Sequence, residues 1–153
     1  MIGAALVLAL CVGAGALVGV QPMLNARLAA TLGSPVAATL VSLGVSIACV
    51  LPVAAFAGLS VRTDELGAAP WWVWCGGVAG AALVGCGLVF APRIGVTLFF
   101  GAVVAGQLLA AALVDHHGWF GAPVRPIDPM RLAGIALVFA GVVVFRLARP
   151  GPG

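Results

Sequence analysis

Five long apolar runs, separated by short segments that contain glycine, proline and arginine, constrain this chain more than any other feature of its sequence. Hydrophobic residues make up 63% of the 153 residues, and charged residues make up only 7%. A soluble domain of this length could not bury so much apolar surface, because soluble domains are about half apolar and about a quarter charged. The sequence therefore predicts an all-α, polytopic membrane protein whose surroundings are the lipid bilayer.

We expect five transmembrane helices in one membrane domain over residues 1–149, because a bilayer core of about 30 Å needs about 20 apolar helical residues. Residues 33–35, Gly-Ser-Pro, are typical of a helix stop, an N-cap and a first-turn proline. The segment "APR" (91–93) is expected to end the third helix, and "DHHGWFGAPVRPIDP" (115–129) to form the longest loop. The expected helices cover about residues 2–32, 35–59, 70–90, 93–114 and 130–147, followed by a short tail at 150–153.

The charged and reactive residues exclude several function classes. The seven basic residues are all arginines and are scattered singly, which does not form a nucleic-acid-binding patch. No Ser/His/Asp set, zinc-ligand spacing or carboxylate pair lies within the expected spans, so we expect neither an enzyme nor a bound metal or other cofactor. The four cysteines (Cys11, Cys49, Cys75 and Cys86) all fall inside apolar runs, where we expect small buried hydrophobic residues.

Polar side chains interrupt the first apolar run in the stretch "GVQPMLNARLAATLGSP" (19–35). Pro22 is expected to kink this helix rather than end it, as prolines in membrane helices often do. Gln21 and Asn25, four residues apart, then share one helix face. With about 1.5 Å of rise per residue from the expected helix ends, Gln21 lies about 17 Å deep and Gln107 about 21 Å deep, both near the midplane.

Polar groups at that depth usually face a protein neighbour or a water-filled cavity. Gln21, Asn25 and Gln107 are therefore candidate substrate-binding residues, and Pro22 is a candidate gating residue. The alternative is that the three amides only hydrogen-bond between helices and stabilise the packing. Asp115, beside two histidines at the end of the expected fourth helix, is a candidate coupling residue, although a role in capping the loop is the alternative.

The arginines give almost no preferred orientation in the membrane. In the expected topology, three of them lie on the N-terminal side and four on the other side: Arg62, Arg125 and Arg131 against Arg27, Arg93, Arg146 and Arg149. Such a balance leaves the positive-inside rule undecided, although all four acids lie on the N-terminal side. We therefore expect the chain to insert in both orientations and to pair with an inverted copy of itself, or else with an oppositely oriented paralogue.

Four segments, "QPMLNARLAATLGSPVAATLVSLGVS", "WWVWCGGVAGAALV", "APRIGVTLFFGAVVAGQLLAAALVDHHGWFG" and "RLAGIALVFAGVVV", resemble the drug/metabolite transporter superfamily, and within it the half-size, five-helix YdcZ family. The resemblance implies one half of an inverted-repeat transporter in the bacterial inner membrane, completed by a second half of opposite topology. Other members of the superfamily have four helices, and these relatives resemble proton-coupled exporters with a carboxylate in the middle of the first helix. Here amides stand on that face, so the resemblance does not extend to proton coupling through a central carboxylate.

These patterns predict a secondary transporter that carries a small organic solute by alternating access. An amide-lined midplane favours a neutral or zwitterionic polar solute over a permanent cation, which would require a buried carboxylate nearby. Two alternatives stay open at this point. One is a carrier of an amphipathic or lipid-linked molecule, and the other is a non-transporting structural subunit in which the amides serve packing.

Overall fold

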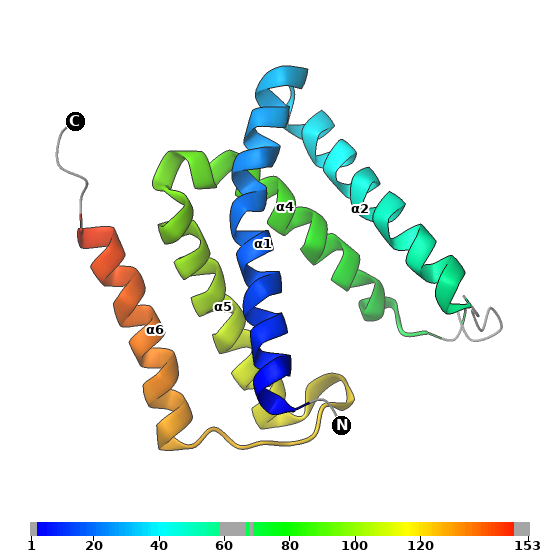
Figure 1. Ribbon diagram of the computed structural model, residues 1–153. Helices are drawn as coiled ribbons and strands as arrows, with labels where there is room; N and C mark the ends of the chain where they lie inside the picture. Colours follow the sequence, from blue (N-terminus) through cyan, green and yellow to red (C-terminus); the bar gives the residue numbers. More distant parts are fainter. Residues whose placement is uncertain (1–2, 59–66, 68, 149–153) are drawn as a thin grey trace. The chain divides into compact units, whose positions relative to one another are not determined.

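The computed structural model of the chain describes residues 3–58, 67 and 69–148, and the regular elements in these residues are all helical (Figure 1). The all-α fold with five long helices is therefore confirmed. In chain order the elements are α1 (Ala4–Leu32), α2 (Pro35–Ala57), the 3-10 helix η1 (Trp71–Trp74), α4 (Cys75–Ile94), α5 (Val96–His117), the 3-10 helix η2 (Trp119–Gly121) and α6 (Pro129–Leu147).

Four helical stretches are long and apolar enough to cross a membrane: Pro35–Ala57, Trp71–Ile94, Val96–His117 and Pro129–Leu147. Their mean hydropathies lie between 1.9 and 2.3. The remaining helix, α1, has 29 residues and is about 44 Å long at 1.5 Å per residue, which exceeds the thickness of a bilayer core. All five helices thus have the length that a membrane span requires.

Large apolar side chains on these helices are mostly exposed on the chain, up to 94% for Phe56. Such a surface can contact lipid without a free-energy penalty, whereas its contact with water would be unfavourable. The same property overturns the expectation that the cysteines are buried. Cys49, Cys75 and Cys86 are exposed, because an apolar side chain in a membrane helix can face lipid as well as protein. The side chain of Cys11 lies outside the described residues.

The chain divides into two compact units, Met1–Arg93 and Ile94–Gly153. In the first unit, α1 and α2 pack against each other as a helical hairpin (Figure 1). Gly33 ends α1 with a φ of 68°, which glycine adopts without steric cost. The Ser34 hydroxyl accepts a hydrogen bond of 3.2 Å from the Ala37 N–H, and Pro35 opens α2. The predicted stop, N-cap and first-turn proline are confirmed.

The third expected helix ends later than predicted. Pro92 and Arg93 stay within α4, which continues to Ile94. Gly95, with a φ of 91°, is the residue at which the chain turns. The prediction that "APR" ends the helix was wrong because the helix ends next to the residue with a positive φ, which glycine adopts freely and proline, with its fixed negative φ, cannot adopt. In consequence α5 begins at Val96 and runs on to His117.

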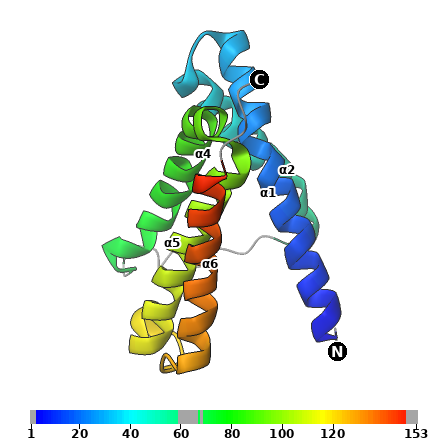
Figure 2. The ribbon, with the colours of Figure 1, turned by 90° about the vertical axis from the view of Figure 1, so that its left-hand side faces the viewer.

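In the second unit, α5 and α6 are antiparallel neighbours that pack along their lengths (Figures 1 and 2). Gly101 permits this close approach, because a Cβ atom there would lie 3.3 Å from Val142 Cγ2. Gly118 ends α5 with a φ of 65°. Asp128 is the N-cap of α6, and its Oδ1 accepts a hydrogen bond of 2.8 Å from the Arg131 N–H. Because α5 continues to His117 and α6 begins at Pro129, the loop expected at 115–129 is shorter than predicted and begins at Gly118.

Candidate functional site

The first group of candidate residues lies on α1, which is a single helix through Pro22 as predicted. Pro22 is buried and Gln21 is half-buried. Asn25 is 6% exposed, and it is the one polar residue in the buried class among the residues that the structure describes. Because proline has no N–H, the Val18 carbonyl, four residues back, loses its helical donor close to the face that carries Asn25.

The surroundings of the Asn25 amide decide what it can do. Within the described part of the chain, no hydrogen bond to another residue engages this amide, yet no side-chain nitrogen or oxygen there is both fully enclosed and unbonded. The amide therefore keeps contact with accessible space. Leaving an amide without a partner in hydrocarbon costs several kcal/mol, so the Asn25 amide needs water, a polar ligand or a polar group of another helix as its partner.

Gln107, the third predicted amide, is exposed on α5 in the second unit. Because α5 begins at Val96, Gln107 lies about 17 Å from the start of its helix, rather than the expected 21 Å. Gln21 lies about 17 Å from the end of α1 by the same measure. That the three amides share one cavity stays a prediction, since Gln107 belongs to a different unit from Gln21 and Asn25.

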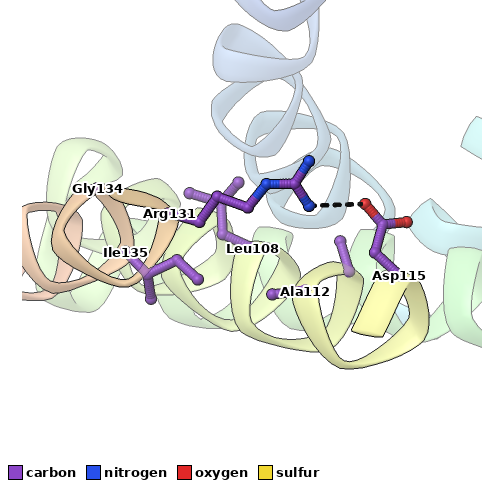
Figure 3. A pocket seen from close by; sticks show the side chains of 7 residues that line it. Leu108, Ala112, Asp115, Arg131, Gly134 and Ile135 are labelled. Carbon is purple, nitrogen blue, oxygen red and sulfur yellow. Dashed lines mark ion pairs between the residues drawn. The ribbon is translucent and has the colours of Figure 1, made fainter. Parts of the chain in front are cut away.

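A second group of polar residues lies where α5 ends and α6 begins, and Figure 3 shows its central pair, Asp115 and Arg131. Arg131 Nη1 lies 3.9 Å from Asp115 Oδ2, and Arg131 Nε lies 3.6 Å from Asp128 Oδ2. The same Nη1 also donates a hydrogen bond of 3.5 Å to the Arg125 carbonyl oxygen. Arg131 thus connects Asp115 on α5 with the N-cap of α6 and with the segment between the two helices.

Other bonds fix the segment between α5 and α6 to the end of α5. The Arg125 N–H donates a hydrogen bond of 2.7 Å to the Asp115 carbonyl oxygen. His116 Nδ1 accepts a hydrogen bond of 3.1 Å from the Ile127 N–H, and His117 stacks on Trp119 with ring centroids 4.9 Å apart. These contacts place Asp115 and its two histidines in a structural role at the loop, and a coupling role for Asp115 stays a prediction.

A hollow of about 430 Å³ extends from the Asp115–Arg131 pair along the seam between α5 and α6. Its other lining residues are apolar: Leu108, Ala111, Ala112, Gly134 and Ile135. Sequence reasoning missed Arg131 as a member of a site, since it was only counted as one of the flanking arginines. The sequence did contain a signal for this pair, because an acid, Asp115, and a base, Arg131, stand at the two ends of the connection between α5 and α6.

Among the residues that the structure describes, no group of three or more His, Cys, Asp or Glu side chains could hold a metal ion. The candidate residues instead offer an amide on a proline-containing helix and an apolar hollow with a paired acid and base at one end.

Comparison with known proteins identifies a family for this chain. The family model described as "Putative inner membrane exporter, YdcZ" matches residues 6–144, which reach from α1 into α6. Searches of curated proteins and of solved structures give no match. The family match covers most of the chain, and the helices have the lengths and apolar character of membrane spans. The chain belongs to the YdcZ family of inner membrane exporters and is a multi-pass transporter of the cell membrane.

Proposed function

We propose that the chain is a secondary transporter of a small, neutral or zwitterionic organic solute and that the solute binds at the amides of Gln21, Asn25 and Gln107. The observation that carries this proposal is the Asn25 side chain, which is 6% exposed and has no hydrogen-bond partner among the described residues. A helix that only needed to span the membrane would place an apolar residue there. An amide at that position is useful when a polar ligand comes to it.

The chemistry of the amides sets the class of solute. A primary amide offers one carbonyl acceptor and two N–H donors but no charge. It can bond hydroxyl, amine, carboxyl or amide groups of a solute, whereas a permanent cation would need an anionic partner. Gln21, one turn before Asn25 on α1, adds a second set of donors and acceptors on the same helix face.

A thermal-shift screen of the purified protein against a library of polar metabolites tests this proposal. Ligands that bind the folded state raise its melting temperature by mass action. Asn25→Leu and Gln107→Leu should abolish the ligand-induced shift while they leave the melting temperature of the ligand-free protein near the wild-type value. If both variants melt earlier and still show the ligand-induced shift, the amides stabilise packing and the chain's solute site lies elsewhere.

Thr31→Val is the matched control on α1. Thr31 is exposed, and its hydroxyl donates a hydrogen bond of 3.1 Å to the Arg27 carbonyl oxygen within its own helix. This substitution removes a polar group from the same helix without touching the predicted face. It should leave both the melting temperature and the ligand-induced shift unchanged.

We further propose that two copies of the chain pair in opposite orientations to form the complete transporter. The balanced arginines allow both orientations, and five helices place the two ends of a chain on opposite sides of the membrane. An inverted copy then supplies the second half that an inverted-repeat transporter requires. Transport by alternating access would follow from the motion of one half against the other around a shared solute site.

Cysteine cross-linking tests this arrangement in a background that lacks the four native cysteines. Arg93, in the last turn of α4, comes just before α5, and Trp119 comes just after α5, so they are expected on opposite sides of the membrane within one chain. In an inverted pair, a chain with Arg93→Cys should cross-link to a chain with Trp119→Cys. Cross-linking between two Arg93→Cys chains, without the mixed product, would show a parallel pair and overturn this part of the proposal.

A further inference from the structure

The seam between α5 and α6 carries two hollows, one after the other. The first, of about 430 Å³, begins at Asp115 and Arg131. The second, of about 350 Å³, is lined by apolar residues that follow at helical spacing along the same two helices, from Val104 to Phe100 on α5 and from Val138 to Phe145 on α6. By helical rise, the distance along α5 from Asp115 to Phe100 is about 22 Å, which is more than half the thickness of a bilayer core.

The charged pair at the end of this seam is placed against the helix dipoles. Asp115 lies in the last turn of α5, where the dipole is negative, and Arg131 lies in the first turn of α6, where it is positive. Each charge therefore destabilises its own helix end, whereas the reverse arrangement would stabilise it. Neither charge is therefore placed where the dipole of its own helix would stabilise it.

The pair also has unused bonding capacity. Its N–O distance of 3.9 Å is longer than the roughly 2.8 Å of a charge-assisted hydrogen bond, and the two side chains are 42% and 39% exposed. The contacts of Arg131 with Asp128 and with the Arg125 carbonyl, at 3.6 and 3.5 Å, are also long. A guanidinium has five N–H donors, so Arg131 can still bind an anionic group while Asp115 binds a cationic one.

We propose that the α5–α6 seam is a binding site for a phospholipid of the surrounding bilayer, with a zwitterionic headgroup that carries both a phosphate and an amine. The phosphate lies at Arg131 and the ammonium group at Asp115. One acyl chain lies along Leu108, Ala112 and Ile135 towards the second hollow. The charged pair belongs to the terminal turns of its helices, which is headgroup depth, and the apolar lining lies deeper, which is acyl-chain depth.

None of the residues that line this site is one of the three amides of the proposed solute site, Gln21, Asn25 and Gln107, and the proposal does not depend on the identity or the transport of the solute. Two other occupants are conceivable, namely a helix of a second copy of the chain and a helix of its own Met1–Arg93 unit. Either helix would keep lipid out of the seam, so the tests below distinguish both of them from a bound phospholipid. A zwitterionic lipid has both charges and an apolar chain in this order.

Native mass spectrometry of the detergent-purified protein tests the proposal with two lipids. Phosphatidylethanolamine has a phosphate and an amine, whereas phosphatidylglycerol has a phosphate and no amine. We expect the wild type to retain phosphatidylethanolamine in preference to phosphatidylglycerol. Asp115→Asn should reduce this preference by about fivefold, because an exposed ion pair contributes at most about that factor. Equal retention of the two lipids by the wild type would overturn the proposal.

A pair of alanine substitutions tests the position of the acyl chain. Ala112→Leu places a larger side chain in the first hollow and should reduce the amount of retained phosphatidylethanolamine by about tenfold or more. Ala110→Leu is the matched control, because Ala110 is exposed on the same helix and does not line the hollow. If Ala112→Leu retains as much lipid as Ala110→Leu does, the seam is covered by protein and the proposal fails.

Photocross-linking gives a readout that does not depend on the folding of a variant. Wild-type protein is illuminated with a phosphatidylethanolamine that carries a photoreactive group on its acyl chain, and the labelled peptides are mapped. We expect labels on α5 and α6 around Ala112 and Ile135, and competition by unlabelled phosphatidylethanolamine. Labels spread evenly over the exposed faces of all five helices would indicate only the bulk bilayer and would overturn the proposal.

Discussion

The carboxylate of Asp115, near the end of α5, lies 3.9 Å from the guanidinium of Arg131, in the first turn of α6. These two residues close the α5–α6 hairpin at its charged end, together with the hydrogen bond from the Arg125 N–H to the Asp115 carbonyl oxygen. The same pair borders the apolar hollow between the helices. One contact therefore connects the structure of the loop with one end of the apolar hollow.

The stability that this ion pair provides should be small. Both side chains are more than a third exposed, and exposed ion pairs contribute about 0.2–1 kcal/mol. A double-mutant cycle with Asp115→Asn and Arg131→Gln, measured by unfolding in detergent, should give a coupling free energy below about 1 kcal/mol. A coupling above about 2 kcal/mol would show that the pair mainly serves stability.

Asp128 supplies the comparison for that cycle. Its carboxylate accepts a hydrogen bond of 2.8 Å from the Arg131 N–H as the N-cap of α6. Loss of such a cap costs about 1 kcal/mol. Asp128→Ala should therefore destabilise the protein by about this amount, even though its side chain contacts the same arginine as Asp115.

Gly118 should tolerate substitution worse than any other residue of the α5–α6 connection. It has a φ of 65°, and a Cβ there would lie 2.7 Å from Val124 Cγ2 and 3.1 Å from the Ala122 carbonyl oxygen. Gly121 has a φ of 80° but has no atom near such a Cβ. Gly121→Ala should cost about 1 kcal/mol for the backbone conformation alone. Gly118→Ala should cost clearly more, and equal melting temperatures of the two variants would contradict this.

Much of the fold was predictable because membrane helices are governed by a few strong rules. Apolar runs of the required length gave five helices, and the Gly33, Ser34 and Pro35 sequence located the first turn, since each residue has a specific local role there. The continuity of α1 through Pro22 also followed from a general property of membrane helices. These features depend on local sequence and on the bilayer, and not on which helices pack together.

The errors have a different origin. The third helix was expected to end before "APR" (91–93), whereas α4 continues to Ile94, because proline and glycine are both turn formers and only the backbone shows which residue has the positive φ. The cysteines were expected inside the protein, but a membrane helix has two apolar environments that sequence does not distinguish. Arg131 was overlooked because its contact with Asp115 requires the register of α5 against α6, which no local pattern gives.

The proposal of two orientations makes a prediction about membrane insertion. Activity of a reporter fused to the C-terminus should appear on both sides of the membrane, because the arginines give almost no bias. Two or three lysines added at one end should shift all of the reporter activity to one side. A reporter that is active on one side only in the unmodified chain would require an oppositely oriented paralogue as the partner.

Transport by the purified chain tests the central claim most directly. Liposomes that contain only this protein are loaded with a solute that raises its melting temperature, and the release of the solute is followed over time. The wild type and Thr31→Val should release it at equal rates. Asn25→Leu should be slower by about fivefold to tenfold, because a buried hydrogen bond to the solute is worth about 1 to 1.5 kcal/mol. Release by Asn25→Leu at the wild-type rate, with the protein intact, would contradict the assignment of the solute site to α1.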